Sequence, residues 1–207
     1  MTPSYCIYGA SGHSKVIIDI IENTGGTIDS LFDDDKTKTA LLGYYVTNDV
    51  DIFQKQFVQW LIGIGNNFIR KKIVDLFSLS FGTAIDKSAQ ISKRASIGQG
   101  SVIMPGVTVN SSSIIGRHCI VNTNSSVDHD CVLENYVHVS PNATLCGGVF
   151  VGEGTHVGAG AVVVPGINIG KWCTIGAGAV IIKDVPHYST VVGNPGRIIK
   201  SEKQNEP

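Results

Sequence analysis

An aliphatic residue recurs at every sixth position over nearly half of this chain. From Ile85 to Ile181, seventeen consecutive positions at this spacing hold Ile, Leu or Val. They are Ile85, Ile91, Ile97, Ile103, Val109, Ile115, Val121, Val127, Leu133, Val139, Leu145, Val151, Val157, Val163, Ile169, Ile175 and Ile181. A small or slender residue follows each of them four positions later, and Gly often follows directly, as in VGEG, VGAG and IGAG. Residues 85–181 are therefore built from a hexapeptide repeat.

A period of six fits neither an α-helix nor the simple alternation of a strand. It fits short strands that turn a corner every six residues and stack into a parallel β-helix. Each hexapeptide then forms one side of a three-sided prism and points its aliphatic side chain inward. Residues 18 apart lie above one another, so residues 85–181 make a little over five coils. Such a solenoid buries its core only by stacking, and its ends need caps.

Residues 1–84 show a different pattern, in which apolar segments alternate with helical ones. We expect strands at 5–9, 28–35 and 60–65 and helices at 15–23, 49–56 and 66–77. This order predicts a short, Rossmann-like βαβαβα unit with a parallel sheet. The expected parts of the chain are this unit at 1–84, the β-helix at 85–183, and a capping segment and tail at 184–207.

The turn GASGH at 9–13 lies between the first expected strand and the first helix. Amide groups and the helix dipole at such a turn can hold a phosphate. Gly9 and Gly12 are two glycines instead of the three of a full dinucleotide motif, so a purely structural turn stays open. Asp33 and Asp34 end the second strand, where such folds place a carboxylate on a ribose or base; a solvated loop is the alternative. We predict nucleotide contact here.

His129 lies between two carboxylates, Asp128 and Asp130, in the segment SSVDHDC. Strand alternation would point both carboxylates away from the ring, but a coil corner breaks that alternation. A carboxylate on one ring nitrogen leaves the other free as a base, which suits acyl transfer. The alternative is a solvated surface triplet.

Two further histidines are 18 residues apart, so His138 and His156 should stack on neighbouring coils. Gly147 likewise follows His129 by 18 residues. These four residues should fall within two turns of one prism. Zinc binding by the histidines is an alternative, but no spacing selects zinc and the amino-terminal unit would go unexplained.

Charge and composition exclude several partners. The chain has 16 Lys and Arg against 17 Asp and Glu, a net charge of -1, which offers nothing to nucleic acid or anionic lipid. No apolar run is long enough for a membrane span and no signal peptide is evident, so we expect a cytoplasmic protein. The five cysteines include no CxxC pair, and we expect reduced, mostly buried thiols. We expect His118 and His187 to be surface or packing residues.

The complete pattern resembles the hexapeptide-repeat acetyltransferases of bacteria, in particular the nucleotide-linked amino-sugar N-acetyltransferases and the related sialic-acid O-acetyltransferases. The resemblance is carried by YGASGHSKV (8–16), FDDDK (32–36), GIGNN (63–67), VDHDCVLENYVHVSPNATLCGG (127–148), VGAGAVVVPG (157–166) and VVGNPGRIIK (191–200). It implies a left-handed β-helix, a homotrimer, acetyl-CoA as co-substrate and no metal.

The resemblance also implies roles for individual residues. His129 would be the general base, oriented by Asp130 where the family more often has Glu. His138 would help position the acetyl group or the acceptor, and the Gly147 amide would face the thioester oxygen. The residues expected at the sugar nucleotide are Gly9, Ser11, Gly12, His13, Asp33 and Asp34. Those expected along acetyl-CoA are His138, Gly147, His156, Gly158, Ala159, Gly176 and Ala177.

The implied reaction is direct acetyl transfer to the amine of a nucleotide-linked 4-amino-4,6-dideoxy sugar, UDP-linked, in bacterial glycan biosynthesis. A sialic-acid or other sugar O-acetyltransferase would use the same parts and stays open. A structural or ice-binding β-helix would need regular Thr or Ser arrays, and a nucleotide sensor would not need His129. Residues 85–181 carry only five acidic and five basic side chains, so prism sides can pack together, which favours a homotrimer with the site shared between chains.

Overall fold

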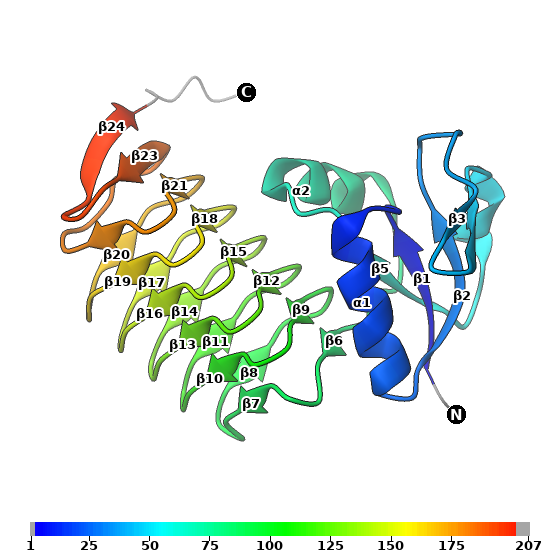
Figure 1. Ribbon diagram of the computed structural model, residues 1–207, viewed down its shortest axis with the longest axis horizontal. Coiled ribbons are helices and arrows are strands. Elements are labelled where there is room, and N and C mark those ends of the chain that lie inside the picture. Colours follow the sequence, from blue (N-terminus) through cyan, green and yellow to red (C-terminus); the bar gives the residue numbers. More distant parts are fainter. Residues whose placement is uncertain (1–2, 202–207) are drawn as a thin grey trace.

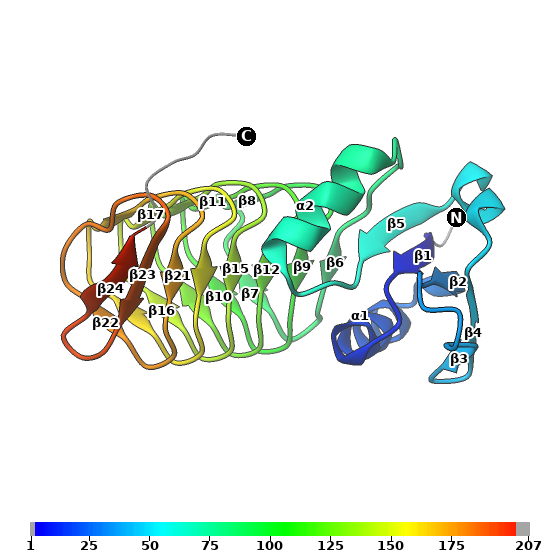
Figure 2. The same ribbon diagram turned by 90° about the horizontal axis from the view of Figure 1, so that it is seen from above.

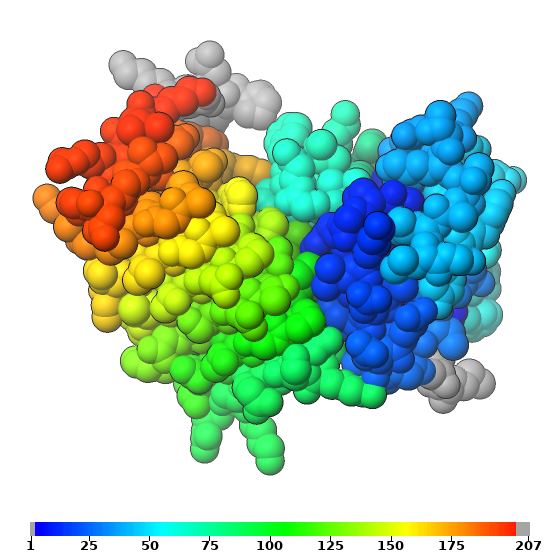
Figure 3. Space-filling view, viewed as in Figure 1, coloured from blue at the N-terminus to red at the C-terminus, as the bar shows by residue number. Residues whose placement is uncertain are grey.

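The computed structural model describes residues 3–201 and contains two units (Figure 1). An α/β unit at the amino-terminal end lies against a solenoid of short parallel strands. Figure 3 shows the two units in contact along their sides. The expected order, an α/β unit followed by a parallel β-helix, is confirmed.

The α/β unit is a five-stranded sheet in the order β3-β4-β2-β1-β5, parallel except for β3. The strands are β1 (Ser4–Tyr8), β2 (Thr27–Phe32), β3 (Ala40–Leu41), β4 (Tyr44–Thr47) and β5 (Gln59–Ile62). The helices are α1 (Gly12–Asn23), α2 (Asn67–Leu76) and the short 3-10 helix η1 (Val50–Gln54).

The two faces of this sheet are covered by different helices (Figure 2). Strand alternation points Ile7 toward α1, where it joins one apolar cluster, and Tyr8 toward η1 and α2, where it joins another. One expectation was wrong in detail, and one element was not predicted. The helix expected at 49–56 is the five-residue η1, and residues 40–47 form an unexpected hairpin that turns at Leu42 and Gly43, both with positive φ.

The solenoid has three sides, each a column of two-residue strands. The first side holds β6 (Ala84–Ile85), β9 (Val102–Ile103), β12 (Ile120–Val121), β15 (His138–Val139), β18 (His156–Val157) and β21 (Thr174–Ile175). The second holds β7 (Gln90–Ile91), β10 (Thr108–Val109), β13 (Ser126–Val127), β16 (Thr144–Leu145), β19 (Val162–Val163) and β22 (Val180–Ile181). The third holds β8 (Ser96–Ile97), β11 (Ile114–Ile115), β14 (Val132–Leu133), β17 (Phe150–Val151) and β20 (Asn168–Ile169).

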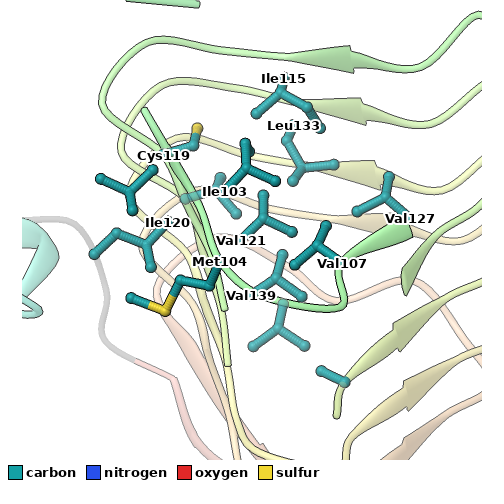
Figure 4. Close-up of a cluster of buried hydrophobic side chains, with 14 of the residues drawn as sticks. Ile103, Met104, Val107, Ile115, Cys119, Ile120, Val121, Val127, Leu133 and Val139 are labelled. Atoms are coloured by element: carbon teal, nitrogen blue, oxygen red, sulfur yellow. The ribbon is translucent and has the colours of Figure 1, made fainter. Parts of the chain in front are cut away.

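The repeat positions fill the interior of the prism. Partners in neighbouring strands are 18 residues apart, as in Ile103 with Val121 and Val121 with Val139. From Ile103 to Ile181 every repeat position is buried, and Figure 4 shows several of these side chains stacked inside the coils. Ile85 is still 36% exposed because only one neighbouring coil covers it. The six-residue period therefore predicted both the register and the core.

From Gly100 onward, the corners of the prism each use one residue in the left-handed conformation. Positive φ recurs every six residues from Gly100 to Gly178. Half of these positions are glycine, which adopts that conformation without strain. The others are Ser112, His118, Asn124, Asp130, Tyr136, Asn142 and Trp172. At these seven corners a side chain is held outside the coil at a small energetic cost, a feature that matters at Asp130 and Trp172.

The carboxyl-terminal end of the first side is closed by a hairpin of β23 (Ser189–Val192) and β24 (Arg197–Ser201). Residues 202–207 of the expected tail lie outside the described residues, and the division into parts at 84 and 183 stays a prediction. No helix within residues 3–201 is long and apolar enough to span a membrane. The five cysteines are all free, and four of them are buried.

Candidate active site

The corner after β13 holds His129 and its two carboxylates. His129 Nδ1 lies 2.7 Å from Asp130 Oδ2, and Asp130 has a φ of 58°. The left-handed conformation lets Asp130 turn back onto the ring, which a regular strand would prevent. Asp128 bonds elsewhere, because its Oδ1 accepts from Asn110 Nδ2 at 2.7 Å and from the His129 N–H at 2.8 Å. The prediction that one flanking carboxylate reaches the imidazole is confirmed.

This environment makes His129 a stronger base than a free histidine. The hydrogen bond to Asp130, followed by the charge of Asp128, raises the pKa of His129 above its ordinary value. The side chain is 60% exposed, and no described residue bonds its Nε2. Nε2 is therefore the nitrogen that can exchange a proton with a bound molecule.

Gly147 lies against the ring of His129 in the next coil. A Cβ built on this glycine would lie 2.6 Å from both Cε1 and Nε2 of His129. A side chain at this position would displace the imidazole. Within residues 3–201 the Gly147 N–H has no acceptor, so it is free to donate to a ligand beside Nε2.

His138 and His156 stack on the first side as their spacing predicted. Their strands β15 and β18 pair in register, and the ring centroids are 4.9 Å apart. His156 Nε2 bonds Ser140 Oγ at 2.7 Å. Burial, followed by the neighbouring His156 and Arg70, lowers the pKa of His138 to about 3. His138 is therefore neutral at physiological pH.

The tautomer of His138 follows from its partners. The Thr123 N–H donates to Asn122 Oδ1 at 2.8 Å, which leaves Asn122 Nδ2 to donate to His138 Nε2 at 3.1 Å. Nδ1 then carries the proton and donates to the Gly65 carbonyl at 3.3 Å. Both ring nitrogens are thus engaged within the chain, so neither of them is free to bond a ligand.

The turn at 9–13 opens α1 as expected. Gly9 has a φ of 103°, and a Cβ there would lie 3.1 Å from the Gly63 carbonyl, so the position needs glycine. Ser11 is the N-cap but makes no capping bond with its side chain. His13 is largely buried, and its Nε2 lacks a hydrogen-bond partner among the described residues. Burial, followed by the charge of Arg70, lowers the pKa of His13 to about 4.

Asp33 and Asp34 follow β2 at this same edge, and both have partners. Asp33 Oδ2 accepts from the Ala10 N–H at 2.7 Å and from Lys38 Nζ at 2.8 Å. Partial burial raises the pKa of Asp33, but these bonds and one from the Asp35 N–H together lower it. Asp34 Oδ2 accepts from the Tyr8 hydroxyl at 2.8 Å. Asp33 is therefore bonded to the GASGH turn through Ala10, and Asp34 is held through Tyr8.

The glycines expected along acetyl-CoA lie at the corner between the first and second sides. A Cβ on Gly158 would lie 2.6 Å from the Ile175 carbonyl, and one on Gly176 would lie 2.8 Å from Val192 Cγ1. Coil stacking alone therefore requires glycine at 158, whereas a side chain at 176 would have to displace Val192 of the terminal hairpin. Ala159 and Ala177 beside them are exposed.

The expected residues form two groups on different parts of the prism. The corner group, His129, Asp130 and Gly147, lies between the second and third sides. The first-side group, His138 and His156 together with the turn at 9–13, lies where the α/β unit packs. Because a three-sided prism has each corner opposite one side, the corner group faces away from the first side. The coils are neighbours, as the spacing predicted, but one chain does not bring the two groups together.

A cavity of about 520 Å³ opens at the first-side group. Residues 65–68 at the start of α2 form one wall, and His138, His156 and Trp172 form the other. Figures 1 and 2 show α2 beside the strands of the first side. The repeat did not predict this cavity. The one sequence signal was Trp172, a bulky residue at a corner position that holds glycine in the four preceding hexapeptides.

Comparisons with known proteins agree with this architecture. The family described as PglD N-terminal domain matches residues 5–77, and bacterial transferase hexapeptide (six repeats) matches residues 148–183. A mutant of perosamine N-acetyltransferase from Caulobacter crescentus, solved with CoA and GDP-perosamine, is 35% identical with a TM-score of 0.92. That match covers 97% of this chain and 99% of the other. The chain belongs to the hexapeptide-repeat acetyltransferases of nucleotide-linked amino sugars.

Two other members of this family are also similar. The acetyltransferase domain of PglB from Neisseria gonorrhoeae FA1090, in complex with acetyl coenzyme A, is 33% identical with a TM-score of 0.89, over 96% of this chain and all of that one. UDP-N-acetylbacillosamine N-acetyltransferase of Bacillus subtilis (strain 168) is 42% identical over 107 residues. That match spans 47% of this chain and 50% of the length of the relative.

Membership of this family confirms three predictions: the family itself, the left-handed β-helix with an α/β unit, and the enzyme class of acetyltransferase. CoA or acetyl-CoA is the ligand in the first two relatives. Within residues 3–201 no group of three His, Cys, Asp or Glu side chains could hold a metal ion. The roles of the individual site residues stay predictions.

Proposed function

We propose that this protein transfers the acetyl group of acetyl-CoA to the amino group of a nucleotide-linked 4-amino-4,6-dideoxy sugar. Relatives that match 97% and 96% of the chain are solved with CoA and GDP-perosamine and with acetyl coenzyme A, respectively. The observation that carries the proposal is the corner group. His129 has Nδ1 on Asp130 and leaves Nε2 next to the unbonded amide of Gly147.

This arrangement supplies the two functions that acyl transfer to an amine needs. The neutral amine of the acceptor attacks the thioester carbonyl carbon, and His129 Nε2 takes the proton that the nitrogen loses. The carbonyl oxygen gains negative charge and accepts from the Gly147 N–H. The C–S bond then breaks, and CoA leaves as the thiolate, which the imidazolium can protonate. Asp130 keeps Nδ1–H in place and stabilises the charged ring.

Cys131, which follows Asp130, favours direct transfer over an acyl-enzyme. Cys131 is buried and its thiol donates to the Cys146 carbonyl at 3.2 Å. Burial raises the pKa of Cys131, so the thiolate needed for a relay is scarce at neutral pH. Transfer without a covalent enzyme intermediate is the simpler course.

The site is completed by a second chain of a homotrimer. The corner group and the first-side group lie on opposite parts of one prism, and the acceptor needs contact with both. In a trimer with its prisms side by side, the corner of one chain can face the first side of the next. Acetyl-CoA would lie between them, along the exposed Ala159 and Ala177.

The nucleotide is bound by the α/β unit in this proposal. The open amino-terminal end of α1 suits the diphosphate, and Asp33 and Asp34 border it on the side of the base or ribose. We expect a uridine nucleotide. The relatives differ in this respect, since one name specifies GDP-perosamine and another a UDP-linked sugar.

Release of CoA thiol from acetyl-CoA tests this function directly. The acceptors to compare are the UDP-, GDP- and dTDP-linked 4-amino-4,6-dideoxy sugars, the free amino sugars, and sialic acid as a hydroxyl acceptor. We expect turnover with a nucleotide-linked amine, highest with UDP. Turnover with sialic acid alone would identify an O-acetyltransferase, and no turnover with any acceptor would contradict the proposal.

A further inference from the structure

Arg70 is a fully buried cation at the junction between the two units. Its side chain is 1% exposed, and all five N–H groups of the guanidinium find acceptors. Nε donates to the His118 carbonyl (2.8 Å), Nη1 to the carbonyls of Ile64 (3.0 Å) and Gly65 (3.3 Å), and Nη2 to Asn67 Oδ1 (2.8 Å) and the Tyr136 carbonyl (2.9 Å).

Every one of these acceptors is neutral. Within residues 3–201 no carboxylate pairs with Arg70. Burying a charge without a counter-charge carries a desolvation cost that a neutral hydrogen-bond donor in the same place would not carry. The charge at this position therefore calls for a role beyond joining the two units.

The hydrogen bonds of α2 follow one column of the solenoid. Arg70 binds the carbonyls of His118 and Tyr136, and Asn67 Nδ2 binds that of Gly154 at 3.0 Å. These three residues are 18 apart and all have positive φ, so each presents its carbonyl at the same corner of successive coils. These bonds to three successive coils fix the position of α2 along the solenoid axis and its orientation against the first side.

The Arg70 guanidinium is linked to His138 through two backbone carbonyl groups. The Gly65 carbonyl accepts from both Arg70 Nη1 and His138 Nδ1, each at 3.3 Å. The Tyr136 carbonyl, which Arg70 also binds, lies two residues before His138 in the chain. Arg70 thus holds both the acceptor of the His138 ring and the backbone that carries it.

The charge of Arg70 also acts on the histidines around the cavity. The groups that face His138 are His156 from β18, His13 from α1 and Arg70 from α2, none of which is acidic. After burial, the positive charge of Arg70 contributes to the lowered pKa of His13, His138 and His156. A protonated ring here would lose its bond from Asn122 and turn away.

We propose that Arg70 is a positioning residue for acetyl transfer, which fixes the neutral His138 ring at the wall of the cavity through the carbonyls of Gly65 and Tyr136. The inference rests on the proposed function, because it assigns a purpose to His138 in that reaction. It concerns a residue that touches neither substrate, since its whole guanidinium is bound by protein oxygens.

The test compares Arg70→Met with Phe81→Leu as a matched control. Phe81 packs edge-on against the His118 ring in the same junction, with 4.5 Å between the ring centroids, and among the described residues no ring contact or hydrogen bond joins it to His138. The protein is labelled with ¹³C-histidine, and the His138 signal is assigned by its absence from the spectrum of His138→Gln. The pH titration of this signal, the melting temperature and kcat are then measured for each variant.

Both variants should melt at lower temperature. In Arg70→Met the pKa of His138 should rise, kcat should fall about 10- to 100-fold, as expected for a displaced positioning group, and the acid limb of the pH profile should become steeper. In Phe81→Leu the His138 titration and kcat should stay as in the wild type. An Arg70→Met protein with wild-type titration and kcat would overturn the proposal.

Arg70→Lys covers the case in which Arg70→Met does not fold. Lysine keeps the charge and loses the fork, so the His138 titration should stay near that of the wild type while kcat falls about tenfold. An unchanged kcat in Arg70→Lys would contradict the positioning role. If the wild type transfers no acetyl group, the proposed function fails, whereas the His138 titration still decides whether Arg70 controls this ring.

Discussion

Gly147 lies directly against the imidazole of His129, so that a Cβ on the glycine would come within 2.6 Å of Nε2. The two residues are 18 apart and belong to neighbouring coils. The stacking of coils thus brings a proton acceptor and a free backbone N–H to the same point outside the prism. In the proposed reaction this proximity would let one site remove a proton from the nucleophile and stabilise an oxyanion.

Replacement of Gly147 by alanine should displace the His129 ring without breaking the coil. The φ of Gly147 is not positive, so the backbone accepts alanine, and the clash falls on an exposed side chain. We expect kcat to fall about 10²-fold with a small change in melting temperature. Gly148→Ala is the control: its φ of 70° strains an alanine, but nothing lies within 3.9 Å. The Gly148→Ala variant should lose about 1 kcal/mol of stability and keep most of its activity. An active Gly147→Ala variant beside an inactive Gly148→Ala variant would refute this account.

The sequence predicted the solenoid well because its core is periodic. Each aliphatic position packs on the residue 18 away, so spacing alone determined the register of His138 on His156. The hairpin at 40–47 was missed because it depends on positive φ at Leu42 and Gly43 and on pairing with β2. The helix at 49–56 was overestimated because Lys55 leaves the helical conformation.

The site was harder to predict because it depends on which side of the prism α2 covers. Arg70 stands in the run NNFIRKK and resembles any exposed helix charge. Only the carbonyls at the corner of the solenoid explain why it is buried. The contact of Asp130 with His129 was predictable, since it is local, whereas the separation of the two groups on opposite parts of the prism is a property of the assembled fold.

Activity should depend on pH through His129. The ring must be neutral to accept a proton, and Asp130 raises its pKa above the ordinary value of about 6.5. Activity should therefore rise with pH through a pKa above that value and then level off. In Asp130→Asn the rising part of the pH–activity profile should move to lower pH. The activity at the plateau should fall about tenfold, because the His129 ring loses its orientation. A limb that moves to higher pH would contradict this account.

Binding of the nucleotide should depend on the carboxylates after β2. Asp33→Asn and Asp34→Asn should each raise KM for the sugar nucleotide about tenfold and leave KM for acetyl-CoA unchanged. Asp35→Asn is the matched control, because Asp35 is exposed and its carboxylate accepts only from Thr37 within the described residues. Equal effects of all three substitutions, or equal activity on free and nucleotide-linked amino sugars, would disprove the assignment.

A site shared between chains should be restored by mixing two inactive variants. His129→Ala lacks the corner group, and His138→Ala lacks part of the first-side group. In randomly assorted mixed trimers about one site in four should combine two intact groups. Activity should recover toward that fraction after co-refolding. Verified mixed trimers that stay as inactive as either parent would place the whole site within one chain.

The most direct test of the account is the turnover of His129→Ala. With wild-type assembly and acetyl-CoA binding verified, kcat for the nucleotide-linked amino sugar should fall about 10²- to 10⁴-fold, the usual contribution of a positioned general base. Assembly and acetyl-CoA binding should survive, because His129 is exposed and its ring bonds only Asp130 among the described residues. A His129→Ala enzyme within a few-fold of the wild type would show that His129 is not the base.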